Sequence, residues 1–104
     1  MNIYRHETSQ TTVSGSVSST SLKIGGGLVR QVLIRALTSN TTVFRADITE
    51  SGGIAVLNYG FHNGEINDTG QTGALPLPVL GNYIINITNA SPEDTFAIRI
   101  LVEE

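Results

Sequence analysis

The sequence contains no cysteine, no tryptophan, one lysine and two histidines in 104 residues. The absence of cysteine excludes a disulfide framework, a thiolate metal site and a cysteine nucleophile. The longest uninterrupted apolar run is four residues, far short of the roughly 20 that a transmembrane helix needs. The polar amino-terminal segment lacks the apolar centre of a signal peptide. We therefore expect no membrane partner and no Sec-dependent secretion.

Charged residues are also scarce. Six Lys and Arg against nine Asp and Glu give a formal net charge of −3. That balance excludes a basic nucleic-acid-binding module. The apolar content of 39% is too high for an acidic disordered chain. A chain of this length buries about 60–70% of its unfolded surface, which is enough for one core.

What the sequence does contain favours strands. Ile (11), Val (8) and Thr (12) dominate, and these β-branched residues fit pleated surfaces better than helices. Gly, Ser and Asn are frequent enough for many turns. Six or seven short strands predict a single all-β domain, an antiparallel β-sandwich or jelly-roll-like fold over residues 11–104. Residues 1–10 have no clear period and are interpreted as a short N-terminal arm.

Two hairpins are the clearest elements. Residues 42–49 alternate cleanly and are followed by a glycine turn and a returning strand over 54–61. A final hairpin pairs residues 81–88 with residues 96–102. Alternation predicts that Phe96, Ile98 and Ile100 pack in the core against Phe44 and Ile48, or against Tyr83, Ile85 and Ile87.

Residues 28–38 are ambiguous. Six of their apolar residues fall on one helical stripe, whereas a strand places Val32 and Ile34 on one face and Leu33 and Leu37 on the other. No good N-cap residue precedes Leu28, and the flanking segments resemble strands, so we interpret the segment as a strand. The preceding glycines, residues 25–27, are interpreted as a turn or β-bulge.

No residues form a recognisable catalytic or metal motif. The polar stretch 62–73 is the longest and is predicted to be the main surface loop. Its His62 and the distant His6 lack the spacing of a zinc site. Residues 67–70 resemble the start of a calcium loop but lack its spaced acids. A triad of His62, Asp68 and a serine lacks a nucleophile elbow, so we expect solvated acids, no cofactor and no enzyme.

Three stretches carry a family resemblance: residues 22–34, residues 44–49, and residues 81–91 with 96–102. Together they resemble small β-sandwich structural proteins of tailed bacteriophages, which decorate capsids or build necks and tails. The terminal hairpin is also similar to the pre-peptidase C-terminal β-sandwich of secreted bacterial enzymes. The resemblance is one of pattern and carries no functional residue across.

The resemblance implies a non-enzymatic virion protein, made in the host cytoplasm. We expect a capsid decoration or cement protein that bridges neighbouring shell subunits. Its partners would be further copies of itself, as a trimer, and the major capsid protein or another virion protein. The alternatives are a phage neck or tail component and a carbohydrate-binding β-sandwich. Carbohydrate binding usually stacks aromatics on sugar rings, but the chain has no tryptophan, and Tyr59, Phe61 and Tyr83 are all candidates for the core.

Interface residues follow from the strand at 28–38, because both of its faces carry large apolar groups. One face can enter the core, and the other needs a loop, the arm or a neighbour to cover it. Arg30 and Arg35 would rim that contact, and Tyr4 would anchor the arm. The hypothetical interface is therefore Tyr4, Arg30, Leu33, Arg35 and Leu37. The alternative is that residues 62–80 fold back over this face.

Overall fold

The computed structural model describes residues 3–13, 15–90 and 92–104. Its elements are the strands β1 (Ile3–Thr12), β2 (Val17–Ala36), β3 (Val43–Glu50), β4 (Ala55–Asn63), β5 (Glu65–Asp68), β6 (Leu77–Asn89) and β7 (Asp94–Glu103). All pairings are antiparallel, in the order β1-β7-β2-β6-β3-β4, with β5 on β2. The all-β antiparallel prediction is confirmed. The predicted final hairpin between residues 81–88 and 96–102 is wrong, because β6 pairs with β2 and β3 whereas β7 pairs with β1 and β2. Alternation assigns the buried side of each strand but not the strand with which it pairs. The described residues include no helix that could cross a membrane.

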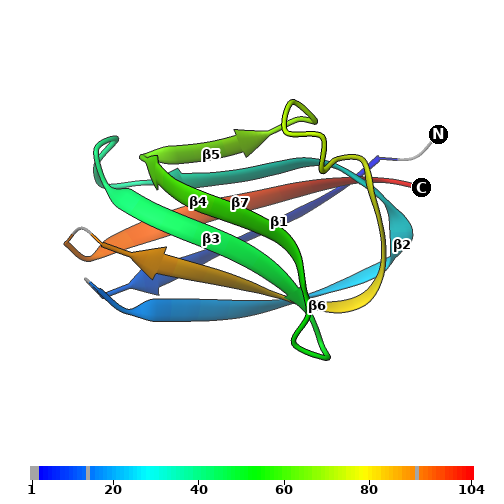
Figure 1. The fold of residues 1–104 in the computed structure, drawn as a ribbon, viewed down its shortest axis with the longest axis horizontal. Coiled ribbons are helices and arrows are strands. Elements are labelled where there is room, and N and C mark those ends of the chain that lie inside the picture. The colour runs from blue at the N-terminus through cyan, green and yellow to red at the C-terminus, as the bar shows by residue number, and fades with distance from the viewer. Residues whose placement is uncertain (1–2, 14, 91) are drawn as a thin grey trace.

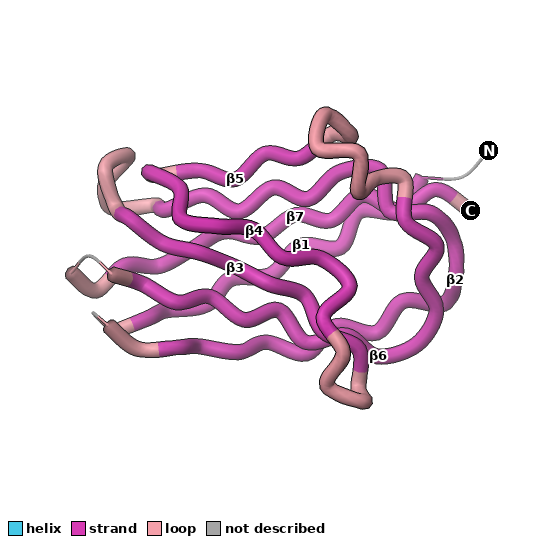
Figure 2. The backbone as a smooth tube through the Cα atoms, in the orientation of Figure 1, coloured by secondary structure: helices cyan, strands magenta, loops and turns pink. Residues whose placement is uncertain are grey.

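Strand β2 belongs to both halves of the sheet. Its first part, from Val17 to Val29, pairs with β6, and its second part, from Leu28 to Ala36, pairs with β7 and β5. Because β2 bends between these parts, the two halves face each other as layers (Figures 1 and 2). We call β2-β6-β3-β4 the β3 layer and β1-β7-β2-β5 the β7 layer.

The bend lies at the three glycines, where the register of β2 against β6 shifts between Ile24 and Gly27. The prediction of a bulge at residues 25–27 is confirmed. Gly26 and Gly27 have φ angles of 127° and 141°, which side chains other than glycine rarely adopt. A Cβ atom at Gly27 would lie 2.6 Å from the carbonyl oxygen of Glu103. Both the bend and the close approach to β7 therefore need glycine.

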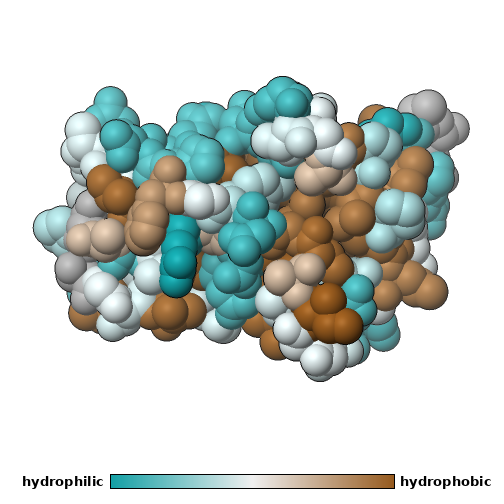
Figure 3. All heavy atoms as spheres, in the orientation of Figure 1, coloured by the Kyte–Doolittle hydropathy of each residue, from teal (hydrophilic) through white to brown (hydrophobic). Residues whose placement is uncertain are grey.

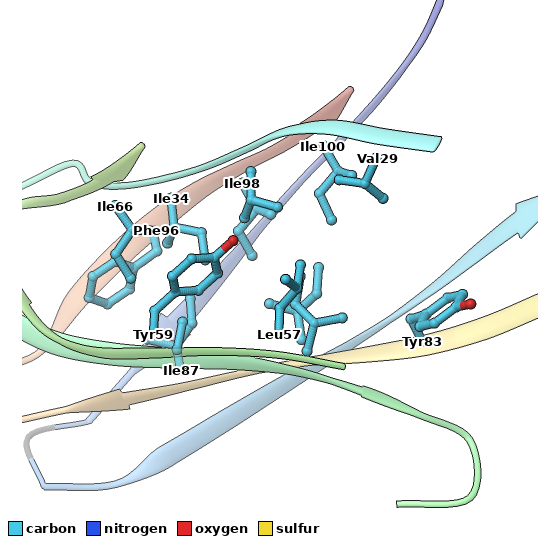
Figure 4. Packing of buried hydrophobic residues seen from close by; sticks show 14 of the residues in the cluster. Val29, Ile34, Leu57, Tyr59, Ile66, Tyr83, Ile87, Phe96, Ile98 and Ile100 are labelled. Carbon is cyan, nitrogen blue, oxygen red and sulfur yellow. The ribbon is translucent and has the colours of Figure 1, made fainter. Parts of the chain in front are cut away.

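The core lies between the two layers. The Phe44 and Phe96 rings meet at 4.6 Å between centroids and 55° between planes. Figure 4 shows Ile34, Ile66 and Ile98 directed toward the side chains of the opposite layer. The predicted core is confirmed, since Phe44, Ile48, Tyr83, Ile85, Ile87, Phe96, Ile98 and Ile100 are all buried in one cluster. Residues up to Ala36 are strand, as predicted, with Val32 and Ile34 buried.

The expected N-terminal arm is instead an edge strand for the residues that are described. Strand β1 pairs with β7 from Ile3–Glu103 to Thr12–Asp94, so β7 satisfies backbone groups that a free arm would leave to water. The side chain of Gln10 is buried and donates to the Ser18 carbonyl at 3.2 Å. The alternation of β1 is not evident in the sequence, because polar residues occupy the inward positions of this strand. Residues 1 and 2 lie outside the described part.

Two expectations about residues 54–73 also need correction. Residues 65–68 are not loop but strand β5, which pairs with β2 and inserts Ile66 into the core. Phe61 and Tyr59 were both core candidates, but only Tyr59 is buried, and Phe61 is 57% exposed. The register of β4 against β3 shifts between Phe44 and Ala46. A bulge of this kind moves the following side chains to the other face.

We expect Gly27→Ala to destabilise the fold by about 1–3 kcal/mol, because the methyl group meets backbone and the φ angle is unfavourable. Gly25→Ala is the matched control, since a Cβ there contacts nothing within 4 Å and its φ is not positive. Urea denaturation of both variants measures the difference. Equal stability of the two variants would show that the bend does not depend on Gly27.

Replacement of Ile98 by alanine should cost about 2–5 kcal/mol, because the side chain fills the core between the layers. Ile98→Asp should prevent folding, since an unpaired charge would be buried. The exposed Ile54 supplies the control, Ile54→Ala, for which we expect less than about 0.5 kcal/mol. Thermal denaturation followed by circular dichroism tests all three. A cooperatively folded Ile98→Asp protein would contradict the assigned core face.

Candidate functional site

Three of the five hypothetical interface residues lie together. Leu33, Arg35 and Leu37 alternate with the buried residues of β2 and point away from the core, on the outer face of the β7 layer. Leu33 lies opposite Asn67 on β5 and Arg99 on β7, and Arg35 lies opposite Glu65 on β5 and Ala97 on β7. Leu37 is the first residue after β2. We call the surface made by Leu33, Arg35, Leu37 and Ala97 the Leu33 face.

The Leu33 face is an open depression with a volume of about 170 Å³. Leu33, Leu37 and Ala97 give it an apolar floor, and Arg35, Arg99 and Glu7 stand around it. Leu37 is 58% exposed. The segment 62–80 does not fold over this face, because β5 pairs with the edge of β2 and extends the layer sideways. The depression is thus available to another molecule.

Ion pairs rim the depression. The Nε of Arg35 lies 3.6 Å from a carboxylate oxygen of Glu65, and the Nε of Arg99 lies 3.5 Å from one of Glu7. Arg5 also approaches Glu7, at 3.6 Å. Exposed pairs of this kind add only about 0–1 kcal/mol to stability. Their side chains can therefore exchange partners, and in a contact they would set register more than affinity.

The structure places Arg30 and Tyr4 elsewhere. Arg30 sits at a second irregularity of β2, and its Nε and Nη2 donate to both carboxylate oxygens of Glu103 at 3.0 and 3.1 Å. That bidentate pair holds the guanidinium at the far end of the β7 layer from Leu37. Tyr4 lies opposite Val102 on β7 and lines a hollow beside the glycine bend.

The outer face of the β3 layer has a different chemistry. A row of polar side chains crosses it: Ser19 Oγ donates to Asn86 Oδ1, and Asn86 Nδ2 donates to Asp47 Oδ1, each at 2.7 Å. The Arg45 guanidinium lies over the Phe61 ring at 5.6 Å. Figure 3 shows polar atoms over the middle of this face and apolar atoms gathered toward the start of β6. The side chains of this row therefore hydrogen-bond to one another.

Asp68 is buried, so its expected position on a solvated loop was wrong. Tyr59 donates its hydroxyl to Asp68 Oδ2 at 2.7 Å, Thr72 donates to the same oxygen at 3.2 Å, and the Gly70 amide donates to Oδ1 at 3.0 Å. Burial, the hydrogen bond and the charge of Asp68 all raise the pKa of Tyr59 above its ordinary value. This arrangement ties the turn after β5 to β4 and holds no free reactive group.

Asp94 is the second buried carboxylate. Its Oδ1 accepts hydrogen bonds from the Thr38 amide at 2.9 Å and the Thr95 amide at 2.7 Å, and its Oδ2 accepts from the Thr42 hydroxyl at 2.7 Å. Burial alone would raise the pKa of Asp94, but the donated hydrogen bonds outweigh it and hold the pKa below its usual value. Asp94 therefore fastens the loop after β2 to the start of β7.

The histidines do not join these carboxylates. His62 is exposed, and its Nδ1 lies 2.7 Å from the Gly60 carbonyl oxygen. His6 lies on β1, opposite Ile100. Within the described ranges, no three His, Cys, Asp or Glu side chains are grouped so that they could hold a metal ion. The Leu33 face therefore offers apolar contact area with charged side chains around it.

No family model matches the chain, and no curated protein matches it. The chain is similar to the solved structure of Aeromonas hydrophila PliG, a periplasmic lysozyme inhibitor of g-type lysozyme. The TM-score is 0.51, the match covers 95% of this chain and 86% of that chain, and 11% of the residues are identical. At this identity the similarity shows the fold alone.

Neutralising Asp94 should destabilise the protein in a pH-dependent way. Because its folded pKa lies below the unfolded value, its contribution is present at neutral pH and is lost as pH falls through the folded pKa. We expect Asp94→Asn to cost about 1–3 kcal/mol at pH 7. The difference in the free energy of unfolding between Asp94→Asn and the parent protein should narrow below about pH 4. Urea titrations between pH 7 and pH 2.5 measure it, with the exposed neighbour Glu93→Gln as control; a gap that is constant with pH would contradict the assignment.

Proposed function

We propose that this chain is a non-enzymatic structural protein of a tailed bacteriophage virion. It acts as a capsid decoration or cement protein, and the Leu33 face seats on neighbouring shell subunits. The observation that carries the proposal is the Leu33 face itself. It is an open apolar depression on paired strands with charges of both signs around it. The resemblance of the sequence to phage structural β-sandwiches is the reason for proposing a phage virion as the particle that this face contacts.

The face suits attachment to a repeating surface. Its strands are paired within the layer, so little backbone order is lost on binding. Apolar contact at Leu33 and Leu37 provides affinity, while Arg35 and Arg99 align the contact. A depression of this size gives a modest contact for one copy. Many copies on a lattice, joined to one another, bind far more tightly through multivalency.

The competing function classes find less support in the described residues. Tyr59 and Tyr83 are buried, so they are not available to stack on a sugar ring. Phe61 is exposed, but the Arg45 guanidinium lies over it. The two buried carboxylates are occupied by structural hydrogen bonds. A binding function without catalysis and without a cofactor fits these buried tyrosines and hydrogen-bonded carboxylates best.

Inhibition of g-type lysozyme, the activity of PliG, is also binding without catalysis. The shared fold does not carry that activity to this chain at 11% identity. A cell-wall lysis assay of a g-type lysozyme, with and without equimolar protein, tests it directly. Strong inhibition there, together with no binding to phage particles, would replace the present proposal.

A charge on the floor of the Leu33 face should abolish attachment. We expect Leu37→Asp to weaken binding to empty capsids at least about 100-fold, because a carboxylate on the floor would replace apolar contact area and would be desolvated on binding. Leu80→Asp is the matched control, since Leu80 is 75% exposed and lies on β6, outside the β7 layer. Co-sedimentation with purified empty capsids, and separately with tails, of the phage that encodes the chain measures both variants.

Capsid binding lost in Leu37→Asp and kept in Leu80→Asp supports the proposal. Binding to tails alone would move the function to the neck or tail alternative. Parent protein that sediments with neither particle would overturn the virion assignment. Circular dichroism of both variants should match the parent, because both leucines are already exposed.

A further inference from the structure

We infer that two copies of this chain associate through the outer edge of β1. The two β1 strands pair antiparallel about a two-fold axis at His6, and they join the two β7 layers into one continuous sheet. This contact uses the strand edge and not the Leu33 face. It leaves the apolar floor of Leu33, Leu37 and Ala97 uncovered, although it shares Glu7 with the rim of that depression.

The edge is open. Strand β1 ends the path of paired strands, and within residues 3–13, 15–90 and 92–104 it pairs only with β7. Backbone groups along its other side point away from the layer and can pair with a further strand. Ile3 and Tyr4 are 60% and 47% exposed at one end of this edge. Pairing over residues 3–9 would cover them.

Charge favours the register with the axis at His6. With the axis at His6, Arg5 of each copy lies directly opposite Glu7 of the other. Moving the axis to Arg5 would place two arginines opposite each other, and moving it to Glu7 would do the same with two glutamates. Directly opposed like charges destabilise a strand pair, and opposite charges stabilise it. Charged edges usually prevent sheet association, but here one register is self-complementary.

The neighbouring strand reinforces this register. Arg99 on β7 already lies opposite Glu7 within one copy, with 3.5 Å between Nε and the carboxylate oxygen. Arg5 of the second copy would approach the same carboxylate from the other side. Each Glu7 then lies between two arginines across the joined sheet. On the opposite side of the strands, Tyr4 meets Thr8 of the second copy.

A two-fold axis closes a dimer, so we replace the trimer expected from the sequence. An axis perpendicular to the sheet keeps equivalent side chains on the same side. Both Leu33 faces of the dimer would then point in one direction. Two such faces could contact two neighbouring subunits of a larger particle at once.

Cysteine crosslinking tests the register, because the chain has no cysteine of its own. Residues directly opposite in an antiparallel pair have Cα atoms about 4.5–5.5 Å apart, within the range of a disulfide. His6→Cys should therefore form a disulfide-linked dimer under mild oxidation. Thr8→Cys is the matched control on the same side of β1, and it should crosslink poorly because its opposite residue is Tyr4. Equal crosslinking of the two variants, or none in His6→Cys, overturns the register.

Charge reversal tests the contact without a covalent bond. Arg5→Glu and Glu7→Arg should each weaken the homodimer at least about tenfold, whereas an equimolar mixture should form heterodimers. Sedimentation equilibrium and native mass spectrometry distinguish these species, with Arg45→Glu on β3 as a control of equal charge change. A parent protein that is monomeric at several hundred micromolar, or trimeric, overturns the inference. If Glu7→Arg fails to fold beside Arg99, the crosslinking result decides.

Discussion

The structure depends on one strand that serves both layers. β2 can pair with β6 and then with β7 only because it turns at Gly26 and Gly27. At Gly27 the chain also passes so close to Glu103 and Val102 that a side chain would not fit. Without that bend the sheet would stay open, and Phe44 and Phe96 would not meet. The hydrophobic core is therefore a consequence of glycine positions as much as of apolar residues.

The core residues of the regular strands were predictable from the sequence, whereas the irregular parts and the partners of β6 and β7 were not. β3, β6 and β7 alternate strictly, so their core residues could be assigned by periodicity. In β2, two bulges shift the inward positions from Ile24 to Val29 and then to Val32. Those shifts create a spacing that imitates a helix. β1 and β5 were missed because Gln10 and Asp68 occupy inward positions that a periodicity argument reserves for apolar residues.

The same contrast holds for the surface. Leu33 and Leu37 could be assigned to an exposed face because they alternate with a buried set on one strand. The roles of Asp68 and Asp94 could not, since Thr42 and Asp94 are 52 residues apart in the chain and meet only through the fold. The sequence does not indicate which hydroxyl or backbone amide will donate to which carboxylate. Arg30 shows the reverse case, because its predicted partner was another subunit and its observed partner is Glu103.

The pairing of β1 with β7 has a consequence for how the protein is made. β1 is synthesised before the other described strands, and its partner β7 is the last of them. Contacts between such distant segments form slowly, and on the ribosome β1 must wait until residues 94–103 have emerged. Until then its backbone is exposed to chaperones and proteases. A product truncated before β7 would lack the strand with which β1 pairs, so its β1 would remain without a partner in the β7 layer.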